Sequence, residues 1–238
     1  GLLVGGVRLI DHLVPGYREA LAERIGRRID ADIDIQAIEL RWQWNGPLLE
    51  LADVRVTRHG FNQPAVTLAS LGLHFSFTDL IHGKRLPDGL TLERPTLTLR
   101  RGEDGRPQLA YWSRPGDAPL DWNTVNERMA MLRSARISDA DITLLDARLP
   151  DGRGRIERLD ARIARSENES YGLQFNLDGL NWLEHAQGQA RFSGRLPNID
   201  TAEFEFSVDG LDTPSLARST QLIEPALRER LSGGRLAA

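Results

Sequence analysis

The sequence contains no cysteine, and its cations are almost all arginine, since Lys84 is the only lysine. The missing cysteine excludes disulfide bonds, thiolate metal sites and cysteine nucleophiles. The net charge of −4 argues against a nucleic-acid partner, because phosphate backbones are held by clustered positive charge. Hydrophobic residues at 40% and charged residues at 27% of the 238-residue chain are typical of a folded protein.

Motifs for catalysis and for cofactor or metal binding are missing as well. No two of the five histidines have the i, i+4 spacing of a helical zinc site, and no G-x-S-x-G nucleophile elbow occurs. Gly152-x-Gly154 lacks the third glycine of a dinucleotide loop, so it is read as a turn. We therefore expect no catalytic residue, no metal site, no cofactor and no enzymatic activity. A hydrolase whose groups meet only in the folded chain is the third-ranked hypothesis.

No apolar run is long enough to cross a bilayer, which takes about 20 residues. The first residues, Gly1–Ile10, read GLLVGGVRLI and are interrupted by Arg8. They also lack the basic region and cleavage site of a complete signal peptide. Two interpretations fit residues 1–10: a buried first turn, or the remnant of an N-terminal transmembrane helix.

An amphipathic helix is predicted within residues 11–30. Pro15 suits the first helical position, and Tyr17, Leu21 and Ile25 recur on one side. The cluster Arg24, Arg27 and Arg28 stands near its end. These cations are either a solvated helix end or a membrane-proximal patch for anionic headgroups.

From Ile33 onward the hydrophobic period changes to two, which is typical of strands. The phase of the alternation changes at Ala37–Ile38, which predicts a bulge or a turn. Asn45-Gly46-Pro47 predicts a turn, and similar strands separated by Asp-Gly pairs continue to Val208. The pattern predicts a mainly β fold with a few helices: a long, curved antiparallel meander with an N-terminal helix and short capping helices.

The chain is divided by a Pro/Gly-rich loop near residue 117. We expect a first β-groove unit at 31–113, a loop plus helix at 114–134, a second β-groove unit at 135–210, and C-terminal helices at 211–238. A loose repeat runs through both β units: Leu51-x-x-Val54-x-Val56, Leu92-x-x-Pro95-x-Leu97-x-Leu99 and Ile137-x-x-Ala140-x-Ile142-x-Leu144. Two interpretations fit this pattern: a structural repeat, or a chance match, since any bulged strand pair produces it.

The alternation places apolar side chains on one side of the sheet. Eight strands of this kind present roughly 700 Å² of apolar surface, more than the 300–600 Å² or so that a typical monomer leaves exposed. The short helices cannot cover it, so a partly open apolar groove is predicted. The residues expected to face it are Leu40, Trp42, Leu51, Val54, Val56, Leu73, Phe75, Leu97, Leu99, Ile142, Leu144, Leu173 and Phe175. Trp42 and Trp44 share a strand face and suit core packing, a groove wall or a membrane interface.

Residues Ile35–Val56 resemble the start of the AsmA-like periplasmic proteins, specifically the YhdP branch. The resemblance rests on a strand ending in Arg41-Trp42, a Gly46-Pro47 turn, and the L-x-x-V-x-V strand that begins at Leu51. Val66–Phe77 and the segment Leu90–Leu99 continue in the family's order, and the similarity covers residues 1–145.

This resemblance implies a repeating β-groove similar to the bridge-like lipid transfer proteins. It implies phospholipid as the partner, a periplasmic location with an N-terminal helix in the inner membrane, and lipid movement toward the outer membrane of a Gram-negative cell. It favours the transmembrane-remnant interpretation of residues 1–10. The alternative is an envelope assembly factor whose sheet packs on its own helices or on a protein partner.

Overall fold

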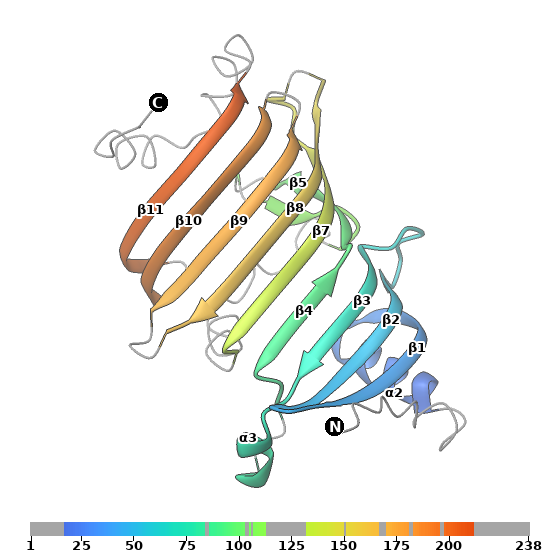
Figure 1. The fold of residues 1–238 in the computed structure, drawn as a ribbon. Helices are drawn as coiled ribbons and strands as arrows, with labels where there is room; N and C mark the ends of the chain where they lie inside the picture. Colours follow the sequence, from blue (N-terminus) through green and yellow to red (C-terminus); the bar gives the residue numbers. More distant parts are fainter. Residues whose placement is uncertain are drawn as a thin grey trace.

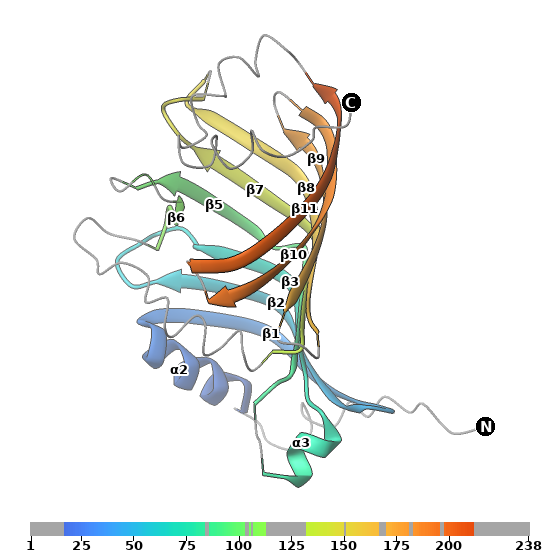
Figure 2. The ribbon, with the colours of Figure 1, turned by 90° about the vertical axis from the view of Figure 1, so that its left-hand side faces the viewer.

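The computed structural model describes residues 17–83, 86–102, 105, 107–112, 132–149, 151–166, 170–180, 183–195 and 198–211. In this part of the chain, strands dominate and form one curved, twisted sheet (Figure 1, Figure 2). The elements are α2 (Tyr17–Ile29), β1 (Ala31–Gln43), β2 (Gly46–Arg58), β3 (Val66–His74), α3 (Phe77–Ile81), β4 (Gly89–Glu93), β5 (Thr96–Arg101), β6 (Pro107–Leu109), β7 (Ser134–Leu145), β8 (Arg153–Arg165), β9 (Tyr171–Leu180), β10 (Leu183–Arg195) and β11 (Asn198–Leu211). The predicted mainly β fold with few helices is confirmed.

The eleven described strands follow the order β1-β2-β3-β4-β7-β8-β9-β10-β11, with β5 between β3 and β7 and with β6 on β5. Strands β4 and β5 occupy one position in the sheet, because β3 pairs with both of them and β7 pairs with both of them. Strands of the two predicted β units are therefore hydrogen-bonded within a single sheet.

The sheet is mixed, whereas the sequence predicted an antiparallel meander. Strand β7 runs parallel to β4 and β5, and all other pairs are antiparallel. The chain between Arg101 and Ser134 makes the parallel arrangement possible, because a parallel neighbour needs a long crossover where a hairpin needs only a tight turn. The two-residue period of a strand is the same in both arrangements, so it carries no information on strand direction.

A line of backbone irregularities, here called the crease, crosses the middle of the sheet. Asp53, Arg94 and Asp139 have positive φ values of 48°, 46° and 56°. Each is the third residue of one copy of the repeat predicted from sequence, and register places Arg94 beside Asp139. A residue with positive φ takes up one position of the alternation, so apolar residues three apart lie on the same side. Each copy of the pattern therefore contains one residue with positive φ at the same place.

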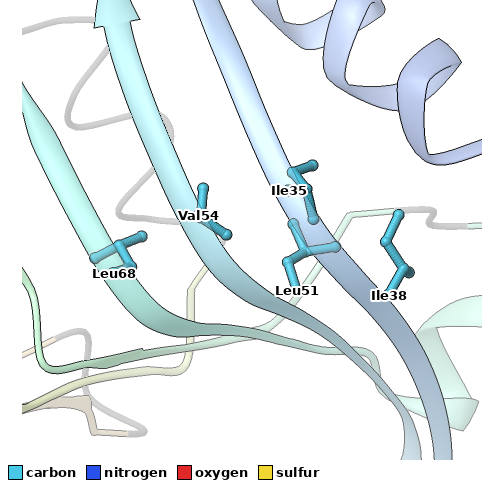
Figure 3. Close-up of a cluster of buried hydrophobic side chains, with 5 residues drawn as sticks. All are labelled: Ile35, Ile38, Leu51, Val54 and Leu68. Atoms are coloured by element: carbon cyan, nitrogen blue, oxygen red, sulfur yellow. The ribbon is translucent and has the colours of Figure 1, made fainter. Parts of the chain in front are cut away.

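The core lies where β1, β2 and β3 meet. Its five buried side chains project from one side of these strands (Figure 3). They are Ile35, Ile38, Leu51, Val54 and Leu68. Ala22 of α2 packs against this cluster, so α2 covers the β1 end of the sheet. Ile35 and Ile38 are both buried although three residues apart, which confirms the predicted phase change at Ala37–Ile38.

The β1–β2 hairpin turns at Trp44-Asn45, as the Asn45-Gly46-Pro47 signal predicted. Gly46 has a φ of 147°, and a Cβ atom there would lie 1.8 Å from the carbonyl oxygen of Phe75. Only glycine allows this approach of the hairpin to the chain that follows β3. The amide of Phe75 donates to the carbonyl of Pro47 at 3.0 Å, which joins the same two segments.

Several predicted elements lie partly or wholly outside the described residues. The predicted N-terminal helix is described over Tyr17–Ile29, whereas residues 1–16, which include the candidate transmembrane remnant, lie outside. Residues 113–131 hold most of the predicted loop and helix, and residues 212–238 hold the predicted C-terminal helices; both segments also lie outside. Helix α3 was not predicted, because five residues are too few to show a helical period.

The crease gives a first prediction. Arg94→Gly should raise the free energy of unfolding by about 0.5–1 kcal/mol, because glycine adopts positive φ without steric cost. Arg94→Val should lower it by about 1–2 kcal/mol, since a β-branched residue is strained there. Urea denaturation of both variants measures the difference. Arg55→Val is the control: Arg55 is an exposed β2 residue outside the positive-φ group, so this change should stay within about 0.5 kcal/mol. Equal effects of glycine and valine at position 94 would contradict the prediction.

Candidate functional site

One side of the sheet, here called the apolar face, carries apolar residues in rows that run across the strands. A row is a set of residues that the pairing register places directly opposite one another. For the row members in β1 to β10, the side chains share a side of the sheet. One complete row is Ile38, Leu51, Leu71, Leu92, Ile137, Ala161, Phe175, Gly188 and Phe206. The next is Leu40, Leu49, Leu73, Leu90, Ala135, Ile163, Leu173, Ala190 and Phe204. Both rows span nine strand positions without a polar residue.

The rows continue on the other side of the crease. One consists of Ile33, Val56, Val66, Leu97, Ile142 and Ile156. Another segment consists of Ala140, Leu159, Leu177, Ala186 and Val208. Because β1, β2, β3, β7 and β8 all change phase at the crease, the apolar residues on both sides of it lie on the same face. The crease therefore bends the strands without interrupting the apolar face.

Burial along the apolar face is uneven. Ile38 and Leu51, beside α2, are 2% and 3% exposed, and the small residues Ala186 and Ala190 on β10 are also buried. Leu173 and Phe175 on β9 are only half-buried, although every neighbour in register is apolar. No large side chain in the described part is fully buried. The described residues therefore cover the large side chains of β9 only in part.

Glycine at position 188 makes room on this face for an aromatic ring. Gly188 lies opposite Phe175, and a Cβ atom at 188 would lie 2.8 Å from two atoms of that ring. The ring of Phe175 therefore lies across β10 rather than standing upright from β9. At the end of the same strand pair, the rings of Tyr171 and Phe192 stack with centroids 5.4 Å apart. The aromatic groups of β9 and β10 line this part of the apolar face.

The opposite side of the sheet, the polar face, is held by cross-strand charge pairs. Arg155 on β8 bonds to Asp141 on β7, with Nε to Oδ1 at 3.0 Å, and this contact lowers the pKa of Asp141. Asp178 on β9 binds both His185 on β10, at 2.6 Å, and Arg158 on β8. The bond from His185, followed by that from Arg158, lowers the pKa of Asp178. The charge pairs of β7–β10 thus lie on the side of the sheet opposite to the apolar rows.

The structure brings most of the predicted groove-facing residues together. Register and alternation place on the apolar face Leu40, Trp42, Leu51, Val54, Val56, Leu73, Leu97, Leu99, Ile142, Leu144, Leu173 and Phe175. Phe75 follows β3 and lies outside the strands, so register does not place it. That these residues contact a ligand stays a prediction. Sequence reasoning left out Ile38, Leu71 and Ile137, which occupy the centre of the longest row and follow the same alternation.

Two of the three predicted membrane-proximal cations are described with their side chains. Arg24 and Arg27 are exposed on α2, and Arg27 forms an ion pair with Glu23 at 2.6 Å. The side chain of Arg28 lies outside the described part. Their role toward headgroups stays a prediction.

Two hollows lie at the borders of the apolar face. A crevice of about 660 Å³ separates α2 from β1; apolar Ala22 and Ile33 line it together with charged Glu19, Arg27 and Asp34. A smaller cavity of about 230 Å³ lies where β5 meets β7 and is lined by Leu99, Leu144 and Leu149, among others. The Arg101–Asp146 ion pair, at 3.2 Å, borders the smaller cavity. Both apolar and charged residues line each hollow.

Within the described residues, no cluster of three or more metal-ligating side chains occurs. No helix in the same part of the chain has the length and hydropathy needed to span a membrane.

The fold and this face define a class of protein: a large curved sheet with one continuous apolar side, a β-groove. The whole-chain comparison agrees with this class. The family model described as YhdP protein matches residues 1–232, so the chain belongs to the YhdP family. The family is associated with the bacterial envelope and is not a known enzyme family. No curated protein and no solved structure matches the chain.

His59 borders the α2–β1 crevice and gives a second prediction. Its Nδ1 lies 2.9 Å from Asp30 and its Nε2 lies 3.1 Å from Asp32. Hydrogen bonding to Asp30 and then to Asp32 raises the pKa of His59 above its usual value of 6.5. The protonated ring is favoured in the folded state, so its stabilising contribution is present below pH 6.5 and is lost as the pH rises through the raised pKa.

Titration of the His59 ring protons by NMR measures this shift. Asp30→Asn should bring the pKa of His59 back toward 6.5, and Asp32→Asn should do so to a smaller extent. A His59 titration that is the same in the original protein and in Asp30→Asn would contradict the prediction.

Proposed function

We propose that the apolar face binds the acyl chains of phospholipids and that the chain is a segment of a lipid conduit between the inner and outer membranes of a Gram-negative envelope. The observation that carries the proposal is the pair of unbroken apolar rows across nine strand positions. Membership of the YhdP family supports it, because that family is similar to the bridge-like lipid transfer proteins.

The dimensions of the face suit this cargo. Nine strand positions at ~4.8 Å give a face about 40 Å across, whereas one leaflet of a bilayer core is about 15 Å thick. Acyl chains could therefore lie along the face one after another. Each methylene that leaves water contributes about 0.8 kcal/mol, and this attraction has no preferred direction. A surface made only of aliphatic and aromatic groups would hold a chain without fixing it at one point, as movement along the face requires.

The separation of the two faces supports a groove rather than a closed core. The ion pairs Arg155–Asp141 and Arg158–Asp178 keep the polar face suited to water. Headgroups would remain at the edge of the apolar face, where charged residues are among those that line both hollows. Nothing in this mode of binding uses a nucleophile, a general base or a metal ion, so we propose a non-catalytic role. The association of the YhdP family with the bacterial envelope supports a periplasmic location.

One observation favours the second candidate, an envelope assembly factor. Helix α2 already packs on the apolar face at β1, which shows that this surface accepts an amphipathic helix. A helix from a protein partner could cover the half-buried residues farther along in the same way. The two candidates differ in what occupies the β9 region: acyl chains or a polypeptide.

A third prediction separates these candidates by site-specific photocrosslinking. Leu173 lies on the apolar face, and its chain neighbour Gln174 is exposed on the polar face. With the photoreactive residue benzoylphenylalanine at position 173, irradiation in the presence of phospholipid should give a lipid adduct, detected by mass spectrometry. The same residue at position 174 should give none, because that side chain points away from the acyl chains.

Positions 175 and 176 form a second pair for the same experiment, since Phe175 and Asn176 also lie on opposite faces. Equal adduct yields on both faces would indicate nonspecific association and would count against the proposal. Polypeptide adducts at 173 and 175, with no lipid adducts, would favour the assembly factor.

A further inference from the structure

Exposed apolar side chains gather at one end of the molecule. In the described part, the exposed large apolar residues are Ile29, Trp42, Trp44, Phe77, Leu80, Ile81 and Leu86. All except Ile29 belong to the end of β1, to the β1–β2 turn, to α3 or to the segment just after α3. Figure 1 shows that this turn and α3 lie at the same end of the sheet. We call Trp42, Trp44, Phe77, Leu80 and Ile81 the apolar tip.

The apolar tip is built into the fold. The rings of Trp42 and Phe77 stack with centroids 5.9 Å apart and an interplanar angle of 11°. The amide of Phe77 donates to the carbonyl of Asn45 at 3.2 Å, so the hairpin and α3 are also joined through the backbone. Ser76 caps α3 by accepting from the amide of Asp79. Two side chains nevertheless extend into solvent, since Trp44 is 94% and Ile81 is 82% exposed.

Two groups of ion pairs lie next to the apolar tip, one on the hairpin and one at α3. Residues 42–47 carry no charge. Directly behind them, Arg41 is 50% exposed, whereas its acidic partners Glu39 and Glu50 are 31% and 25% exposed. On the α3 side, Arg133 is 69% exposed, whereas its partners Asp79 and Asp88 are 18% and 21% exposed. These ion pairs set four carboxylates against two guanidinium groups, so the charge described behind the apolar tip is net negative, whereas the apolar tip itself is uncharged.

We propose that the apolar tip docks into the interface of a phospholipid bilayer, with Trp44 and Ile81 as the inserted side chains. Indole rings favour the headgroup level of a membrane, because the ring is apolar and its N–H is polar. The apolar tip is continuous with the apolar face, which is proposed to bind acyl chains, and this continuity favours a bilayer over a protein partner.

This inference rests on the proposed function and adds an entry point to it. Trp42 pairs in register with Pro47, next to Leu40 and Leu49 of the apolar face. The apolar face thus runs without interruption into the apolar tip. A lipid whose acyl chain leaves the bilayer at the apolar tip would remain in contact with apolar side chains on its way to the sheet.

The test is co-sedimentation with vesicles of phosphatidylcholine alone and of phosphatidylcholine mixed with phosphatidylglycerol. Trp44→Ser and Ile81→Ser should each lower the partition coefficient by about tenfold with both vesicles. The effects of these two substitutions should not depend on phosphatidylglycerol, because neither side chain is charged. Gln174→Ser is the control: this exposed residue of β9 lies on the polar face, outside the apolar tip and away from α2, so binding should be unchanged.

A second readout locates the contact. Brominated acyl chains should quench part of the tryptophan fluorescence, and Trp44→Phe should remove that part while keeping vesicle binding. Any affinity contributed by residues 1–16 is common to all variants, so differences between variants report on the apolar tip. Thermal melts show whether each variant is folded; both serine substitutions alter side chains that are more than 80% exposed and should leave the melts unchanged.

The outcomes separate this inference from the proposed function. Unchanged vesicle binding in the Trp44→Ser, Ile81→Ser double variant would overturn the docking site, and so would an original protein that does not bind vesicles. Lipid adducts at Leu173 would still support the acyl-binding face in either case. Vesicle binding that depends on the apolar tip, together with no adducts at Leu173, would support docking and contradict the conduit.

Discussion

The structure depends on backbone register. Each strand exposes its side chains alternately on two sides, so a shift of one residue between neighbours would exchange apolar and polar groups over a whole strand. Nine strand positions remain in phase across the sheet, and the separation of an aliphatic side from a charged side follows directly. The ion pairs on the polar face add to this constraint, because Asp178 meets both Arg158 and His185 only when three strands are correctly aligned.

The crease shows how such a sheet can bend without losing its separation of faces. A kink in a single strand would move the following residues to the wrong side. Here the phase change occurs at the same level in neighbouring strands, through Asp53, Arg94 and Asp139 in three of them. Since all of these strands change phase together, the rows on either side stay aligned. Curvature and a continuous surface are therefore compatible.

Much of this arrangement could be predicted from sequence because it is local. Two apolar residues three apart, as in Leu51 and Val54, cannot share a face of a regular strand, so their spacing indicates a bulge. Strand direction could not be predicted, because β7 pairs with β4 and β5 through contacts distant in sequence. The stacking of Trp42 on Phe77 was missed for the same reason: the sequence shows that each is aromatic but not that the turn and α3 meet. The exposure of Trp44 depends on whether anything packs over the hairpin, which no local pattern records.

The parallel joint at β7 has a consequence for how the chain folds. Strands β1 to β4 pair with near neighbours in sequence, and so do β7 to β11, so each group can form soon after it is synthesised. Joining the groups requires closing the chain from Arg101 to Ser134, which costs entropy before any parallel contact offsets it. We expect this closure to be the slow step, and the unpaired sides of β4 and β5 to be the surface most prone to aggregation until β7 arrives.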